Sequence, residues 1–116
     1  MDKRRILIVD ANKELRTLLS QVLGEFGHEV VATGNRDEAL GREDLEDFDL
    51  IISDLTEDAE GNVQVLSEIK RRRLVVPVVV SSEDTQHPGL VKAFKMGAAN
   101  YLRASADYSA AIELTR

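Results

Sequence analysis

Two short apolar runs that each end in an aspartate constrain the fold of this chain more than any other feature. Residues 6–9 read Ile-Leu-Ile-Val and directly precede Asp10. Residues 50–52 read Leu-Ile-Ile and precede Asp54 after a single serine. A strand that is buried on both faces of a parallel sheet has a continuous apolar sequence, and open α/β folds bind ligands at the carboxyl ends of such strands. We therefore predict two buried strands whose ends carry Asp10 and Asp54.

Helix and strand patterns alternate along the chain with short connections. Apolar residues recur at three- and four-residue steps from Leu15 to Phe26, which predicts an amphipathic helix. Asn12 is placed to cap this helix and Gly27 to end it. Residues 28–33 have polar flanks and few apolar side chains, which indicates a strand at the edge of a sheet.

The whole pattern predicts five strands, each followed by a helix. The expected strands are residues 6–9, 28–33, 50–54, 74–80 and 98–102, and the expected helices begin near Asn12, Gly34 or Asn35, Val63, Pro88 or Gly89, and Ser105 or Asp107. The apolar side chains expected on the inner face of the third helix are Val63, Val65, Leu66 and Ile69. The fourth helix carries Leu90, Val91, Phe94 and Met96. This alternation predicts an α/β fold with one doubly wound parallel sheet covered on both faces.

Length and composition narrow the class of protein. With 116 residues we expect one domain over residues 1–116. No apolar run approaches the roughly 20 residues of a membrane helix, and no cleavage-site pattern follows the N-terminus. The sequence contains no cysteine, which excludes disulfides and thiolate metal sites. A formal net charge of −6 argues against a nucleic-acid surface and against binding to anionic membranes. We therefore expect a cytoplasmic protein.

Four segments together resemble the receiver domains of response regulators in two-component signalling. They are residues 6–10, 49–54, 76–82 and 96–102, and the resemblance extends over essentially the whole chain. It implies a five-stranded flavodoxin-like sheet with the order 2-1-3-4-5. In that order the first and third strands are neighbours, so Asp10 and Asp54 should lie close together at the carboxyl end of the sheet.

The resemblance also implies roles for residues around these two aspartates. Asp54 corresponds to the family's phosphoacceptor, which attacks phosphorus and becomes an aspartyl phosphate. Asp10, Asp54 and the backbone carbonyl of Thr56 correspond to ligands of a Mg²⁺ ion that supports the transfer. Ser82 corresponds to the hydroxyl that bonds the phosphoryl group, and Tyr101 to the switch aromatic that follows it inward.

The resemblance implies protein partners as well. The phosphoryl group would come from a histidine kinase or a phosphotransfer protein. The face of the fourth helix, the fifth strand and the fifth helix would then bind an output domain or a second copy of the chain. The state of the phosphoryl site would thus control a protein-binding surface.

The sequence departs from the family pattern around Asp54. Ala11 replaces the second residue of the acidic pair after the first strand. In the loop after Asp54, Glu57 and Asp58 replace Met and Pro. Glu83 replaces a small residue after the fourth strand, and Ala104 and Ser105 replace Lys and Pro after the fifth strand. Removing one well-placed electrostatic stabiliser costs about 2.7 to 4 kcal/mol of transition-state stabilisation. We therefore expect a weak or absent Mg²⁺ site and slow phosphorylation. Glu57 is a candidate replacement ligand, and Arg103 is a candidate replacement cation.

Two functions stay open at this point. The first is a receiver that accepts a phosphoryl group on Asp54 and switches a binding face. The second is a degenerate receiver that acts as a docking or dimerisation module without phosphoryl chemistry. A flavin carrier of similar fold is disfavoured because the turn at residues 10–13 is acidic and lacks the Gly and Thr of a phosphate cradle. No Ser-His-Asp or zinc constellation is visible, so we do not expect an independent enzyme.

Simpler structural roles compete with some of these assignments. Asp10 can cap the helix that follows it. His28 and His87 are isolated, and we interpret them as surface or capping residues. The acidic run 43–47 and the basic run 70–73 are interpreted as solvated, the latter at a helix C-terminus where cations complement the helix dipole.

Overall fold

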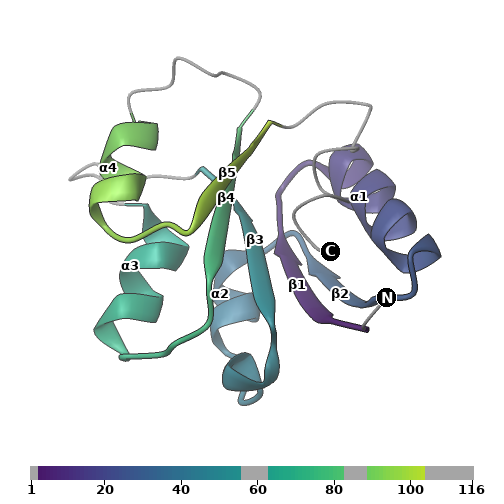
Figure 1. Ribbon diagram of the computed structural model, residues 1–116, viewed down its shortest axis with the longest axis horizontal. Helices are drawn as coiled ribbons and strands as arrows, with labels where there is room; N and C mark the ends of the chain where they lie inside the picture. The colour runs from purple at the N-terminus through teal and green to yellow at the C-terminus, as the bar shows by residue number, and fades with distance from the viewer. Residues whose placement is uncertain (1–2, 56–62, 83–88, 104–116) are drawn as a thin grey trace.

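A computed structural model describes residues 3–55, 63–82 and 89–103 of the chain. The elements in chain order are β1 (Arg5–Val9), α1 (Lys13–Glu25), β2 (Glu29–Thr33), α2 (Arg36–Leu40), the 3₁₀ helix η1 (Leu45–Asp47), β3 (Leu50–Asp54), α3 (Gln64–Arg71), β4 (Val78–Ser82), α4 (Gly89–Lys95) and β5 (Asn100–Arg103). The strands form one parallel sheet in the order β2-β1-β3-β4-β5, which confirms the predicted fold. In Figure 1, α1 lies on one face of this sheet, and α2, α3 and α4 lie on the other.

The register of the sheet decides which residues meet at its carboxyl end. In the β1–β3 pair, Val9 lies opposite Ser53, so the residues that follow each of them emerge side by side. In the β3–β4 pair, Asp54 lies opposite Ser81. The carboxyl ends of three strands therefore form one polar rim above an apolar sheet.

The sheet is buried on both faces, as its continuous apolar runs predicted. Alternate residues of a strand point to opposite faces. One core layer, on the α1 side, contains Ile6, Ile8, Leu19, Leu23, Leu50, Ile52, Val79 and Leu102. The other, under α2, α3 and α4, includes Leu7, Val9, Ile51, Val63, Leu66, Ile69, Val78 and Val80. These two layers fix the strands and so hold the rim in place.

Helix α1 begins and ends where the sequence predicted. The Asn12 side chain accepts a hydrogen bond from the Leu15 backbone N–H at 3.1 Å. Gly27 has a φ of 89°, a conformation that glycine adopts at little cost at a helix end. The expectation that Phe26 belongs to the buried stripe was wrong, because Phe26 lies beyond the last turn and is 39% exposed.

The predicted boundaries of the fourth and fifth strands were also wrong. The run at residues 74–80 is uniformly apolar, but β4 begins only at Val78 and ends at Ser82. Val75 is 93% exposed, and Pro77 contributes only its carbonyl, which accepts from the Ile51 N–H at 3.0 Å. Ser81 and Ser82, which follow the predicted strand, are therefore its last residues. Strand β5 is likewise shifted from residues 98–102 to 100–103.

Helix α4 buries its small side chains most completely. Gly89 and Ala93 are its buried residues. Of its large apolar side chains, Leu90 is partly buried and packs against the core. Val91 and Phe94 are 62% and 48% exposed, so α4 presents apolar side chains to solvent. The expected last helix, beginning near residue 105 or 107, lies outside the described residues.

The acidic run 43–47 is not a solvated connection as expected, because Asp44 and Leu45 are tied into the fold. Leu45 is buried, and Asp44 accepts hydrogen bonds from Arg42 at 2.8 and 3.0 Å and from Arg5 at 2.6 Å. The Arg5 guanidinium also lies 4.5 Å from the centroid of the Phe48 ring. The hydrogen bonds from Arg42, followed by those from Arg5, hold the pKa of Asp44 well below its usual range.

Of two further expectations about charged residues, one was wrong and the other is confirmed. His28 is not a surface residue: it is 6% exposed, and its Nδ1 accepts from the Arg4 N–H at 3.1 Å. The basic run 70–73 is exposed, as predicted, but Arg72 is also bound to protein, because its Nη1 donates to the Leu40 carbonyl at 2.7 Å. Arg72 therefore joins α3 to the end of α2. No helix among the described residues has the length and apolar character needed to cross a membrane.

Replacing one of two valines of the predicted fourth strand tests the corrected boundary. Val78→Ala should lower the free energy of unfolding by about 1.5 to 3 kcal/mol, because a buried side chain is lost. Val75→Ala is the matched control and should change it by less than about 0.5 kcal/mol, because this side chain is in solvent. Urea denaturation followed by circular dichroism measures both. Equal losses would contradict a strand that begins at Val78.

The Asp44 cluster should make stability depend on pH. The folded pKa of Asp44 lies below the unfolded value of about 3.9, so its stabilisation is fully present above that value and is lost as the pH falls through the folded pKa. Asp44→Asn should therefore lower the melting temperature at neutral pH, and the difference from the wild type should shrink as the pH falls below about 4. A difference that is constant with pH would contradict this account.

Candidate functional site

Asp10 and Asp54 lie together at the carboxyl end of the sheet. The pairing of β1 with β3 places the residues after Val9 beside the end of β3. The Asp54 Oδ2 atom accepts a hydrogen bond from the Ala11 N–H at 3.1 Å. The Asp10 Oδ1 atom accepts from the Asn12 N–H at 2.9 Å. The turn after β1 therefore orients both carboxylates. The simpler role expected for Asp10 was wrong, because the residue that caps α1 is Asn12.

A hollow of about 270 Å³ lies beside Asp54 at this rim. Its lining consists of Val9, Ala11, Gly34, Asn35, Arg36, Asp37, Asp54 and Gln64. These residues come from the end of β1, the turn between β2 and α2, the end of β3 and the start of α3. The hollow therefore joins the predicted acceptor to a segment that the sequence analysis had not connected with it.

Arg36 is the cation that lines the described part of this hollow. Its Nη1 donates to the Gln64 side-chain oxygen, and its Nε and Nη2 lie 3.3 Å from the Asp37 Oδ1. The local backbone is fixed because the Asn35 side chain accepts from the N–H groups of Asp37 and Glu38 at 2.8 and 3.2 Å. The guanidinium group is therefore held between α2 and α3 at the wall of the hollow.

Three polar residues at the rim were missed by the sequence analysis. They are Arg16, Arg36 and Gln64. The Arg16 Nη1 donates to the Asp10 carbonyl at 2.9 Å, and it would lie 2.5 Å from a Cβ placed on Gly34. A signal for Arg36 was present, since it follows Asn35, near which a helix was expected to begin. The strand order 2-1-3 brings the end of β2 to the same rim. Nothing in the sequence pairs Arg36 with Gln64.

The predicted switch residues are linked to each other across β4 and β5. Val80 pairs with Tyr101 in the sheet. The half-buried Tyr101 donates its hydroxyl hydrogen bond to the backbone carbonyl of Ser82 at 3.0 Å. The ring is therefore tied to the end of β4, which is the strand end that carries the predicted phosphoryl-binding hydroxyl.

Several predicted site residues lie outside the described part of the chain. They are Thr56, Glu57, Asp58, Glu83, His87, Ala104 and Ser105. The backbone of Arg103 pairs with Ser82 at the end of β5, but its side chain is also outside the description. The proposed replacement of a lysine by Arg103 and of a metal ligand by Glu57 therefore stays a prediction.

The described residues do not fit a resident Mg²⁺ ion. Magnesium requires near-octahedral oxygen ligands. Among residues 3–55, 63–82 and 89–103, no three acidic, histidine or cysteine side chains are grouped closely enough to hold a metal. Ala11 contributes a methyl group at the rim, and the carboxylates of Asp10 and Asp54 each have one oxygen bonded to a backbone N–H.

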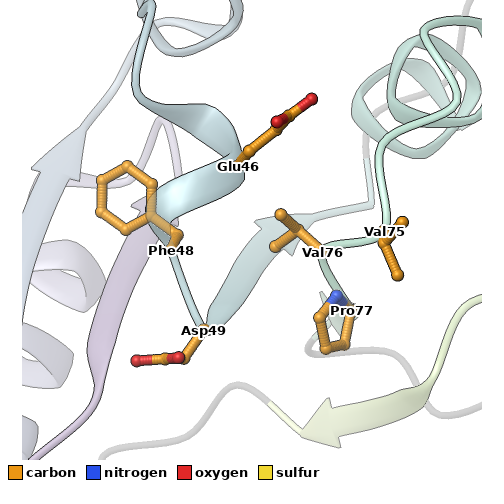
Figure 2. A pocket seen from close by; sticks show the side chains of 6 residues that line it. All are labelled: Glu46, Phe48, Asp49, Val75, Val76 and Pro77. Carbon is orange, nitrogen blue, oxygen red and sulfur yellow. The ribbon is translucent and has the colours of Figure 1, made fainter.

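A second and larger hollow lies at the opposite end of the sheet. It has a volume of about 400 Å³ and is lined by Glu46, Phe48, Asp49, Val75, Val76 and Pro77. Figure 2 shows these side chains around the segments that lead into β3 and β4. Open α/β folds bind their ligands at the carboxyl ends of the strands, so this larger hollow is not the candidate site.

Comparison with curated proteins gives relatives among bacterial regulators. The chain is 33% identical over 102 residues to the transcriptional regulator NtrC of Azospirillum brasilense, covering 88% of the chain and 21% of NtrC. It is 34% identical over 98 residues to the response regulator FleR of Pseudomonas aeruginosa, covering 84% of the chain and 21% of FleR. It is also 32% identical over 100 residues to PdtaR of Mycobacterium tuberculosis, covering 85% and 48%. The chain thus spans about a fifth to a half of these proteins.

Solved structures show the same fold. The chemotaxis protein CheY4 of Vibrio cholerae superposes with a TM-score of 0.81 at 22% identity, covering 98% of this chain and 97% of CheY4. NtrX of Brucella abortus gives a TM-score of 0.81 at 24% identity, covering 98% of this chain and 26% of NtrX. The family model for the response regulator receiver domain matches residues 6–113. The chain therefore belongs to the receiver-domain family of two-component response regulators.

Proposed function

We propose that this receiver domain accepts a phosphoryl group on Asp54. The observation that carries the proposal is the position of this carboxylate, which ends β3 at the wall of the rim hollow and is oriented by the Ala11 N–H. Phosphoryl transfer mainly requires that the protein position the reacting groups and stabilise the charge on the transferred oxygens. A fixed carboxylate at an open rim supplies the positioning.

The donor in this proposal is a phosphohistidine on a histidine kinase or phosphotransfer protein. Receiver domains of response regulators act with histidine kinases and output domains, and this chain matches that family over residues 6–113. A carboxylate oxygen of Asp54 attacks phosphorus and forms a P–O bond. The P–N bond of the donor breaks, and its electron pair stays on the imidazole nitrogen, which takes up a proton from water.

The link between Ser82 and Tyr101 supplies a route from the acceptor to a binding face. In the proposal the Ser82 hydroxyl bonds the phosphoryl group and draws the end of β4 toward Asp54. Tyr101 donates to the Ser82 carbonyl, so the ring follows this movement. The exposed side chains of Val91 and Phe94 on α4 lie on the face that the family uses for output. Exposed apolar side chains of this size suit a protein partner.

A docking module without phosphoryl chemistry is the second candidate. The observation that favours it is Ala11, which removes a carboxylate from the rim and leaves a methyl group beside Asp54. In this case α4 would bind its partner in one fixed conformation. The two candidates differ in whether Asp54 reacts with a phosphodonor.

Asp54→Asn is the variant that separates the two candidates. After incubation with acetyl phosphate, intact-mass spectrometry should show one added phosphoryl group on the wild type, and none on Asp54→Asn because the nucleophilic oxygen is lost. Asp47→Asn is the matched control: this exposed residue ends η1, at the amino end of β3, and the variant should form the adduct at the wild-type rate. An unmodified wild type at saturating donor would favour the docking module instead.

Tyr101→Phe tests the proposed route to the binding face. The variant loses the hydroxyl that donates to the Ser82 carbonyl but keeps the ring. We expect the amount of phosphorylated Asp54 to stay the same, while the change in NMR amide shifts of α4 upon phosphorylation becomes much smaller. Full-sized shifts in α4, or loss of the adduct itself, would show that this hydrogen bond does not transmit the signal.

A further inference from the structure

We infer that Arg36 holds the oxygens of the phosphoryl group on Asp54, and that it does so without a resident divalent cation. This inference rests on the proposed function of Asp54. It assigns a catalytic role to a residue of the β2–α2 segment. In the family pattern, the positive charge at the phosphoryl group comes instead from a lysine after the fifth strand. Ala104 occupies that lysine position in this sequence.

The first support is the position of Arg36 in the fold. Arg36 is the first residue of α2, and it lines the same 270 Å³ hollow as Asp54 and Ala11. The parallel order β2-β1-β3 brings the carboxyl ends of β2 and β3 to one rim on either side of β1. Helix α2 contacts β2 and α3. A phosphoryl group on Asp54 would therefore enter a space that the arginine borders.

The second support is the way in which the guanidinium group is held. Its Nη1 donates to the Gln64 side chain, and its Nε and Nη2 lie 3.3 Å from Asp37. A guanidinium group has five N–H donors, so these contacts leave hydrogens on both terminal nitrogens for an anion. The planar fork of arginine matches the oxygens of a phosphate group. The neighbouring residues thus orient the group without using all its donors.

The third support is the charge balance of the hollow. Ala11 removes one negative charge from the wall that the family pattern makes acidic, and Arg36 adds one positive charge to the same hollow. Both changes favour a phosphoryl anion in the absence of a metal. Asp37 opposes this effect only weakly, because its side chain is 82% exposed and its charge is screened by water.

In the transfer step, one bond to phosphorus forms while another breaks. A carboxylate oxygen of Asp54 forms the new bond to phosphorus, and the bond from phosphorus to the donor breaks. The electron pair leaves with the donor, which is a phosphohistidine in the cell and an acyl phosphate in the test. Arg36 stays protonated throughout and donates hydrogen bonds to the non-bridging oxygens, which gather charge in the transition state.

Arg36 also joins α2 to α3 through Gln64, so a purely structural role must be separated from a catalytic one. Gln64→Ala breaks this connection and keeps the positive charge. If Arg36 were only a connection, Gln64→Ala and Arg36→Gln would lower the rate equally. We expect Gln64→Ala to have the smaller effect, and Arg36→Lys to lie between wild type and Arg36→Gln because it retains the charge without the fork.

The experiment measures the rate of Asp54 phosphorylation by acetyl phosphate in excess EDTA and in Mg²⁺, using intact mass. The wild-type rate should be nearly the same in both, and Arg36→Gln should lower it about a hundredfold. Arg71→Gln is the matched control, since it removes the same charge from the exposed C-terminal end of α3 and should leave the rate unchanged. Melting temperatures of all variants report whether the fold is kept.

The outcomes distinguish this inference from the proposed function. An adduct that requires Asp54 but forms equally in Arg36→Gln, or only in Mg²⁺, would overturn the inference and leave the acceptor role intact. If the wild type forms no adduct, the proposed function fails. A titration with inorganic phosphate in EDTA then tests whether Arg36 binds a phosphate anion in the hollow. A phosphate-induced NMR shift of the Ala11 amide that is seen in the wild type and is lost in Arg36→Gln would support the inference, and an equal shift in both proteins or none in the wild type would overturn it.

Discussion

The parallel pairing of β1 with β3 is the constraint on which the rest of this structure depends. It joins two apolar runs that are far apart in sequence and aligns Val9 with Ser53. Because both strands end at the same rim, the turn after β1 can donate the Ala11 N–H to the Asp54 carboxylate. A slip of one residue would turn every buried side chain to the other face and move this carboxylate away from the turn.

Much of this fold could be read from the sequence because the strands of a doubly wound sheet are apolar throughout. The same property explains why the predicted boundaries of the fourth strand were wrong. Residues 74–77 are as apolar as a strand, but hydrophobicity does not show that Val75 lies in solvent at the amino end of β4. Nor could it show which large side chains of α4 reach the core, since Leu90 packs against it whereas Phe94 is exposed.

The candidate site was only partly predictable, for a related reason. Asp10 and Asp54 can be recognised from the sequence because each is a charged residue that follows an apolar run. Arg36 and Gln64 are 28 positions apart, and their contact exists only because α2 and α3 lie side by side on one face of the sheet. The expectation of a rim short of positive charge came from the position of Ala104, whereas the described structure places a cation on the β2 side.

Chemical mapping identifies the residue that becomes phosphorylated. The wild-type chain is incubated with acetyl phosphate and reduced with borohydride, which converts an aspartyl phosphate to homoserine, and its peptides are sequenced by mass spectrometry. If Asp54 is the acceptor, homoserine appears at position 54 and at no other aspartate. Homoserine at another position, such as Asp10 or Asp37, or its complete absence at saturating donor, would show that Asp54 is not the acceptor.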